Sequence, residues 1–100
     1  MQINVTSRHM NLSSELRNHA EKRADSLVKY YDRISSIDVV LESGGGHTSV
    51  EIIVYAEHKN TFVARKVGDD AHTLIDVVRD NLDRQLKKHK EKQRNRKHTV

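Results

Sequence analysis

The chain has 100 residues, of which 35% are hydrophobic, and a formal net charge of +4 at pH 7. This length and apolar content predict one domain with a single modest core. The sequence holds no cysteine, which excludes disulfides and thiolate metal sites, and no apolar run approaches the ~20 residues of a membrane-spanning helix. Because the N-terminus lacks the basic and apolar segments of a secretory signal, we expect a cytoplasmic protein with no membrane partner.

The first part of the chain predicts a strand followed by a helix. Apolar and polar residues alternate over 2–7, which is typical of a half-buried strand. A helix start follows at Ser13-Ser14, because a serine side chain can cap free backbone N–H groups. Apolar residues then recur at intervals of three and four, so the helix should carry one core-facing stripe to about Tyr31. The stripe comprises Leu16, Ala20, Ala24, Leu27, Val28 and Tyr31.

Three more strands are predicted in the middle of the chain. Strict alternation over 37–41 and 50–56, on either side of a glycine-rich link at 43–47, indicates a hairpin. A turn at 58–60 leads to a fourth strand over 61–66.

The last helix has the clearest periodicity. It should begin at Gly68-Asp69-Asp70, since an aspartate is a good N-cap. It can continue to about Lys92, but past His89 it has nothing apolar to bury and should protrude or fray. Its stripe comprises Ala71, Leu74, Ile75, Val78, Leu82 and Leu86. The order βαβββα predicts an α+β fold in which a four-stranded sheet carries both helices on one face. We expect a single binding domain over 1–93 and a basic, disordered tail over 94–100.

The strongest functional signal is the basic end of the chain. Residues 84–100 carry eight Lys or Arg and one acid, a net charge of +7, whereas residues 1–83 carry −3. Such a segment favours a polyanionic partner, because each neutralised phosphate releases condensed counterions. Nucleic acid is the first candidate, an anionic membrane surface is the second, and a merely solvated surface is the simplest alternative.

The candidate RNA-binding residues are basic side chains of the two predicted helices. They are Lys22, Arg23 and Lys29 on the first helix and Arg84, Lys87, Lys88, Lys90 and Lys92 on the last. Lys22, Lys29, Arg84, Lys87 and Lys88 should face away from the apolar stripes, and Arg23 should lie on the flank of the first helix. Secondary candidates are Asn4 and Thr6 on the outer face of the first strand, and the histidines His9, His89 and His98.

Catalytic and metal-binding patterns are weak in this sequence. The seven histidines form no HxxxH or HExxH pair. The run Gly44-Gly45-Gly46 lacks the Lys-Ser/Thr of a phosphate-binding loop. We therefore expect a binding protein and not an enzyme, with no metal, cofactor or small-molecule substrate.

Parts of the chain resemble a known family. The most specific is the pattern Arg-Gln-Leu-x-Lys-His-Lys that begins at Arg84; the others are Met1–Ser7, Lys29–Ile34, Asp76 and the remainder of Leu82–Lys92. On these residues the chain resembles the ribosome hibernation promoting factor family, which includes protein Y and whose members are also called sigma-54 modulation proteins. The resemblance covers essentially the whole chain and implies a βαβββα fold. It departs at Asp70-Ala71-His72, where the family usually has Asp-Met-Tyr.

The resemblance implies a function and partners. The family binds the small ribosomal subunit, through 16S rRNA, in the channel of messenger RNA and the A- and P-site transfer RNAs. Occupying that channel in the 70S ribosome inhibits translation and preserves idle ribosomes in stationary phase or stress. Because the chain lacks the second domain of long members and the acidic tail of protein Y, it resembles the short members. These favour ribosome dimers with a separate ribosome modulation factor, which is therefore a candidate partner.

Two alternatives remain open on the residues alone. A generic double-stranded RNA-binding module would also combine a sheet with a basic helix, and it should bind plain duplex RNA as well as ribosomes. A domain that contacts a protein partner, or modulates transcription, should bind with little dependence on salt or on the basic helix.

Overall fold

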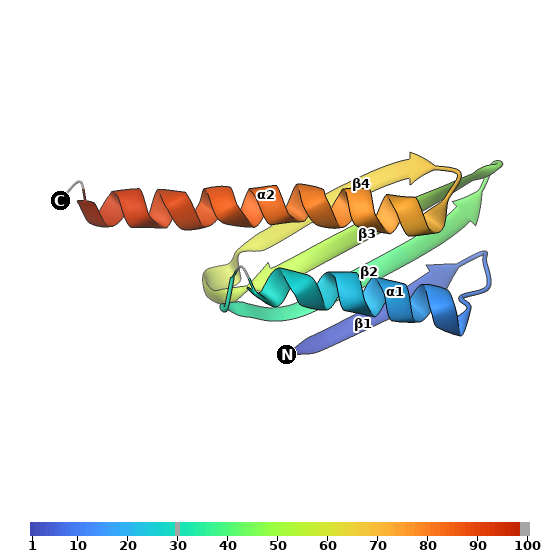
Figure 1. Cartoon of the computed structure of the whole chain (residues 1–100), viewed down its shortest axis with the longest axis horizontal. Helices are drawn as coiled ribbons and strands as arrows, with labels where there is room; N and C mark the ends of the chain where they lie inside the picture. Colours follow the sequence, from blue (N-terminus) through green and yellow to red (C-terminus); the bar gives the residue numbers. More distant parts are fainter. Residues whose placement is uncertain (30, 99–100) are drawn as a thin grey trace.

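Two helices cover one face of a four-stranded sheet, as Figure 1 shows. The computed structural model describes the backbone of residues 1–29 and 31–98 and the side chains of residues 1–29 and 31–92. In chain order the elements are β1 (Gln2–Arg8), α1 (Ser14–Asp25), the 3₁₀-helix η1 (Ser26–Lys29), β2 (Ile34–Gly44), β3 (His47–Ala56), the 3₁₀-helix η2 (Glu57–Lys59), β4 (Thr61–Gly68) and α2 (Ala71–His98). The predicted α+β class and βαβββα order are confirmed.

The strands lie in the sheet in chain order. β1 pairs with β2 in parallel, while β2–β3 and β3–β4 are antiparallel. In this register Val5 lies opposite Val39, and Val39 lies opposite Ile52. Because side chains alternate between the two faces of a sheet, such rows place the apolar residues of neighbouring strands on the same face.

The core lies between that face and the helices. Every residue of the stripe predicted for α2 is buried except Ala71, which is half-buried. The largest fully buried side chains include Ile37, Ile52, Ile75 and Leu82, which come from both layers. Among the described residues, no helix is both long enough and apolar enough to cross a membrane.

The hairpin between β2 and β3 has the turn that its glycines predict. Gly44 pairs with His47, so only Gly45 and Gly46 form the loop. Their φ angles are +60° and +80°. A two-residue turn of this kind needs positive φ at both positions, which glycine adopts without steric cost.

The first helix begins as predicted but ends earlier. Ser13 is its N-cap, and Ser13 Oγ accepts a hydrogen bond from the Leu16 N–H at 3.1 Å. The α-helix stops at Asp25, not near Tyr31, and the chain continues as η1. At this point Ser26 Oγ donates to the Arg23 carbonyl at 2.6 Å. Such a side-chain bond competes with the regular helical pattern, and a 3₁₀ turn is a common helix ending.

The last helix begins where predicted, and the second of the two aspartates is its cap. Asp70 Oδ1 accepts from the His72 N–H at 3.1 Å, and Asp70 Oδ2 accepts from Thr73 Oγ1 at 2.8 Å. The hydrogen bond from Thr73 is the main cause that lowers the pKa of Asp70 below its ordinary value, although desolvation opposes it. These hydrogen bonds therefore favour the charged form of the carboxylate.

This pKa shift predicts a pH dependence of folding. A carboxyl whose pKa is lower in the folded state stabilises the fold above its unfolded pKa, about 4, and this contribution is lost as the pH falls through the folded value. We expect Asp70→Asn, which keeps a good cap, to remove this part of the acid sensitivity. Thermal melts from pH 7 to pH 2 would check it: the difference in melting temperature between wild type and variant should shrink below about pH 4. A constant difference would contradict it.

The other end of α2 is longer than predicted. The helix continues to His98, past Lys92, and extends beyond the sheet (Figure 1). The expectation that it stops rests on the absence of apolar residues, but Lys, Arg and Gln are good helix formers without burial. Residues 94–98 of the predicted tail are thus part of the helix, while 99–100 lie outside the described residues. The division into a 1–93 domain and a tail stays a prediction.

Candidate nucleic-acid interface

Six of the eight predicted RNA-binding residues are exposed and form no ion pair with any described residue. Two are Lys22 on α1 and Lys29 on the η1 turn that continues it; we call them the α1 cations. The other four, the α2 cations, are Arg84, Lys88, Lys90 and Lys92. They lie in the second half of α2, at and beyond the last turns that contact the core. A row of fixed cations on a helix can contact successive phosphates of one partner.

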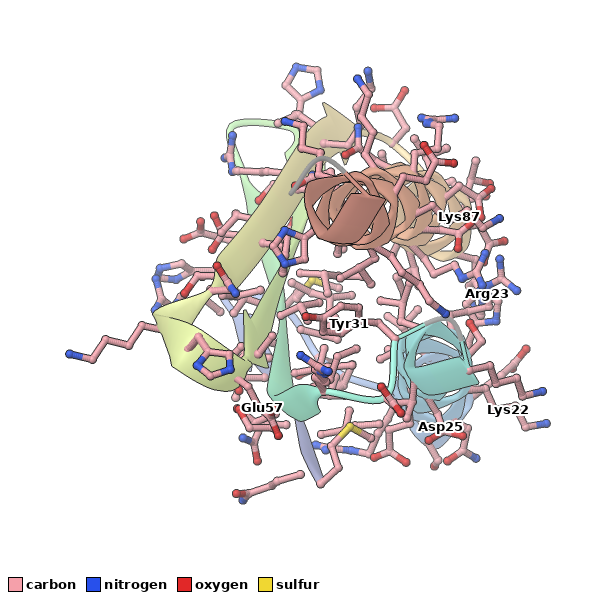
Figure 2. All side chains as sticks on the ribbon, turned by 90° about the vertical axis from the view of Figure 1, so that its left-hand side faces the viewer. Lys22, Arg23, Asp25, Tyr31, Glu57 and Lys87 are labelled. Atoms are coloured by element: carbon pink, nitrogen blue, oxygen red, sulfur yellow. The ribbon has the colours of Figure 1, made fainter. Side chains whose placement is uncertain are left out.

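Lys87 is exposed but already has a carboxylate partner. Its Nζ lies 3.1 Å from Asp83 Oδ2, one helical turn earlier. The Asp83 side chain is only 13% exposed, and its Oδ1 is buried without a hydrogen-bond partner among the described residues. Removing the positive charge of Lys87 would therefore leave a nearly buried carboxylate with less compensation. Figure 2 shows Lys87 on the helical side of the molecule, together with Lys22 and Arg23.

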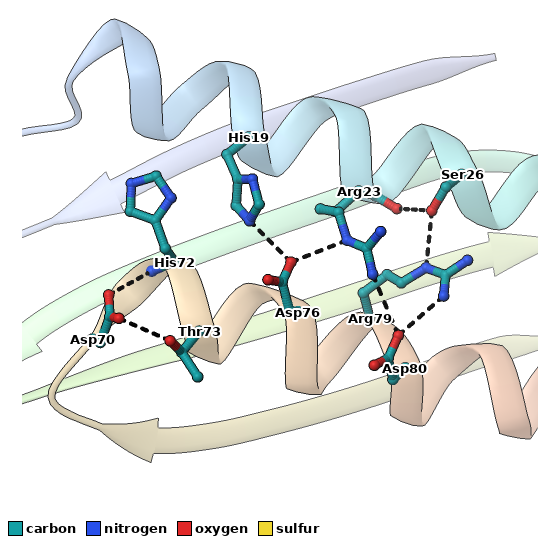
Figure 3. A network of polar contacts seen from close by, with 9 residues as sticks. All are labelled: His19, Arg23, Ser26, Asp70, His72, Thr73, Asp76, Arg79 and Asp80. Carbon is teal, nitrogen blue, oxygen red and sulfur yellow. Dashed lines mark hydrogen bonds and ion pairs between the residues drawn. The ribbon is translucent and has the colours of Figure 1, made fainter.

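Arg23 is also held by carboxylates, in this case across the two helices (Figure 3). Its Nε lies 3.0 Å from Asp76 Oδ1, and its Nη2 donates to Asp80 Oδ1 at 3.4 Å. The Nε atom is buried and satisfies the distance of an ion pair but not the geometry of a hydrogen bond. His19 Nε2 lies 2.9 Å from the same Asp76 oxygen. The Arg23 side chain of α1 thus reaches across to the carboxylates of α2.

A second arginine completes this cluster and was not anticipated from the sequence. Arg79 is buried, with its Nε donating to Ser26 Oγ at 2.9 Å and its Nη1 donating to Asp80 Oδ1 at 3.0 Å. We call Arg23, Asp76, Arg79 and Asp80 the clasp. The only sequence signal for Arg79 is its place next to Val78 on the edge of the apolar stripe, which does not distinguish a buried arginine from an exposed one.

The secondary candidates do not join the exposed cations. Asn4 and Thr6 lie on the open face of the sheet, opposite the helices, where Asn4 Nδ2 donates to Asp38 Oδ1 at 3.0 Å. His89 is half-buried, and its ring packs against Tyr31 and Phe62 with centroid distances of 5.8 and 5.2 Å. Its position therefore supports a packing role and not the predicted phosphate contact. His9 lies in the loop that follows β1, and the side chain of His98 lies outside the described residues.

Two further side chains of α2 and α1 attach the helices to the sheet edges. Gln85 Nε2 donates to the Val63 carbonyl of the edge strand β4 at 3.0 Å. Arg17 Nη1 donates to the Val5 carbonyl of β1, the other edge strand, at 3.4 Å. These bonds occupy backbone groups that would otherwise be open to another strand. In the motif that begins at Arg84, Gln85, Leu86 and His89 thus face the domain, while Arg84, Lys88 and Lys90 are exposed.

The fold and the exposed cations define a small βαβββα domain with a basic helical face. Residues 3–94 match the family described as "Sigma 54 modulation protein / S30EA ribosomal protein", and the chain belongs to this family.

The relatives agree with this assignment along the whole domain. The chain is 32% identical over 93 residues to the ribosome hibernation promoting factor of Azotobacter vinelandii, covering 93% of this chain and 86% of the relative. It is also 32% identical over 98 residues to the ribosome hibernation promoting factor of Escherichia coli K12, covering 92% of this chain and 96% of the relative. A ribosomal subunit interface protein from Coxiella burnetii has a similar structure, with a TM-score of 0.82 at 26% identity; the match covers 91% of this chain and 99% of that one.

Proposed function

We propose that the protein is a ribosome hibernation factor. It binds the small ribosomal subunit, within the 70S ribosome, in the channel of messenger RNA and the A- and P-site transfer RNAs. There it inhibits translation and stabilises idle ribosomes in stationary phase or stress, and it favours ribosome dimers with the help of a separate modulation factor. Family membership and the names of the relatives support this proposal.

The observation that carries the proposal is the set of exposed cations on α1, η1 and α2 that form no ion pair with a described residue. A partner with many phosphates can neutralise them all at once, and the counterions that it releases favour binding. Structured RNA is recognised mainly by its shape and its backbone, which suits a rigid domain with few aromatic side chains. We assign the RNA contacts to the α1 cations and the α2 cations, and to Lys87, whose ammonium group can donate to a phosphate while it stays beside Asp83.

Lys87 can contact a phosphate without leaving Asp83. An ammonium group has three N–H donors, so it can contact the Asp83 carboxylate and a phosphate at the same time. The Lys87 side chain is 53% exposed, so a phosphate can approach it from solvent.

Co-sedimentation with ribosomes tests the proposal. We expect the purified protein to sediment with vacant 70S ribosomes at low salt, and to be released at high salt because the contacts are mainly to phosphates. Ribosomes preloaded with messenger and transfer RNA should not retain it, because the channel is occupied. Equal retention on preloaded ribosomes would contradict the channel site. Equal affinity for plain duplex RNA would favour the generic RNA-binding module, and salt-independent retention would favour a protein partner.

A further inference from the structure

We propose that Arg23 is a positioning residue and not a phosphate ligand. Together with the rest of the clasp it fixes the separation between the α1 cations and the α2 cations. This inference rests on the proposed function, since it concerns how the RNA-binding surface is held in shape. It differs from the role predicted for Arg23 from the sequence, which is a direct contact to RNA.

The first argument is geometric. The Arg23 guanidinium lies between α1 and α2 and spans two carboxylates, Asp76 at 3.0 Å and Asp80 at 3.4 Å. Its side chain is 33% exposed, whereas Asp76 and Asp80 are 44% and 54% exposed. The acceptors are thus more open to solvent than the cation that they hold. A phosphate that approaches the Arg23 guanidinium from solvent would therefore come close to the negative charges of Asp76 and Asp80.

The second argument is the charge of the clasp. Its two arginines and two aspartates sum to zero, so the clasp attracts no polyanion overall. If Arg23 moved to a phosphate, the partners left among the described residues would be the His19 ring for Asp76, at 2.9 Å, and Arg79 for Asp80, at 3.0 Å. Two carboxylates would then lie beside the bound RNA with less compensation, which opposes the exchange. The exposed cations have no such cost, since they form no ion pair with a described residue.

The third argument is the position of the clasp in the fold. The α1 cations and the α2 cations come from helices that are far apart in the chain, and RNA contact needs both sets at one spacing. The clasp links the two helices directly: Arg23 joins α1 to α2, and Arg79 joins α2 to Ser26 at the start of η1. The planar fork of arginine can bond several acceptors at fixed angles, which a lysine cannot do. This geometry suits a residue that holds two helices in register.

The salt dependence of binding separates a phosphate ligand from a positioning residue. The logarithm of affinity for small ribosomal subunits is measured against the logarithm of salt concentration for wild type, Arg23→Gln and Lys88→Gln. Loss of one phosphate contact lowers the slope by about 0.7–0.9. We expect that decrease for Lys88→Gln. For Arg23→Gln we expect an unchanged slope with affinity reduced by about threefold to tenfold at every salt concentration, as when one ion-pair network is broken.

Two more variants guard against a misleading result. Arg23→Lys keeps the charge but cannot span both carboxylates, so it should bind as weakly as Arg23→Gln; full recovery of affinity would overturn the inference. Asp76→Asn keeps Arg23 but removes one of its two carboxylate partners. If Arg23 is a phosphate ligand, this variant should bind RNA more tightly than wild type. If Arg23 is a positioning residue, the variant should bind more weakly, because the clasp is broken. If Lys88→Gln left the slope unchanged, the proposed function would fail. If Arg23→Gln lowered the slope like Lys88→Gln, the inference alone would fail.

Discussion

Replacing Arg84, Lys88 and Lys90 together by glutamine should reduce affinity for the small ribosomal subunit by roughly two orders of magnitude at about 0.1 M salt. These three α2 cations are exposed and unpaired among the described residues, so each is available to a phosphate. Losing three phosphate contacts lowers the slope of log affinity against log salt by about 2–3 and leaves affinity near 1 M salt almost unchanged. A salt series of sedimentation or fluorescence-anisotropy measurements checks both the slope and the affinity.

The chain offers a matched control on the opposite side. Arg8, Lys59 and Arg65 are exposed and belong to the sheet or to η2, so changing them to glutamine removes the same total charge away from the helices. This control should keep the wild-type slope and most of the affinity, since only the general attraction of the domain changes. Equal losses in the two triple variants would mean that net charge and not the helical face binds the ribosome.

Lys87 is left out of the triple variant for a structural reason. From the sequence alone, Arg84, Lys87 and Lys88 form an equivalent outward row, and reversing all three to glutamate appears harmless to folding. Because Lys87 neutralises Asp83, which is almost buried, a glutamate at position 87 would place two like charges one turn apart. Such a variant would lose stability as well as ribosome affinity, and the two effects could not be separated.

The fold was predictable because its signals are local. The periodicity of two in the strands, the period near 3.6 in the helices, the caps Ser13 and Asp70, and the glycine turn each act over a few neighbouring residues. The errors concern the helix ends: α1 gives way to a 3₁₀ turn at Ser26, whose side chain bonds a backbone carbonyl although Leu27 continues the apolar stripe, and α2 continues past Lys92 through polar residues. Apolar periodicity predicts which residues are buried. It does not predict where a helix ends when polar side chains determine the end.

The candidate site was predictable in its charge but not in its pairing. Eight cations of the two helices were assigned to the site, yet only six are exposed without an ion-pair partner among the described residues. Arg23 and Lys87 differ from their neighbours because carboxylates of α2 lie beside them. For Lys87 the partner is four residues away, a spacing that the sequence does display. For Arg23 the partners come from another helix, so they become visible only in the folded chain.

The end of α2 that carries the cations depends on Leu86, and Leu86→Ala should lower the free energy of unfolding by about 2–5 kcal/mol. Leu86 is 1% exposed and is the last of the fully buried residues of α2 among those described. Its truncation removes apolar burial and leaves a cavity beside the sheet. Since a small domain is stable by only about 5–15 kcal/mol, this is a large fraction. Chemical denaturation monitored by circular dichroism gives the value.

Val77→Ala is the matched control on the same helix, because Val77 is 42% exposed and its truncation should change stability by about 0.5 kcal/mol or less. A loss below about 1 kcal/mol for Leu86→Ala would contradict its role as the anchor of α2. The substitution removes no charge, so wherever the variant is folded its ribosome binding should keep the wild-type salt slope. A lower slope in the folded variant would mean that the α2 cations no longer reach the RNA together, and hence that Leu86 holds them in place as well as stabilising the core.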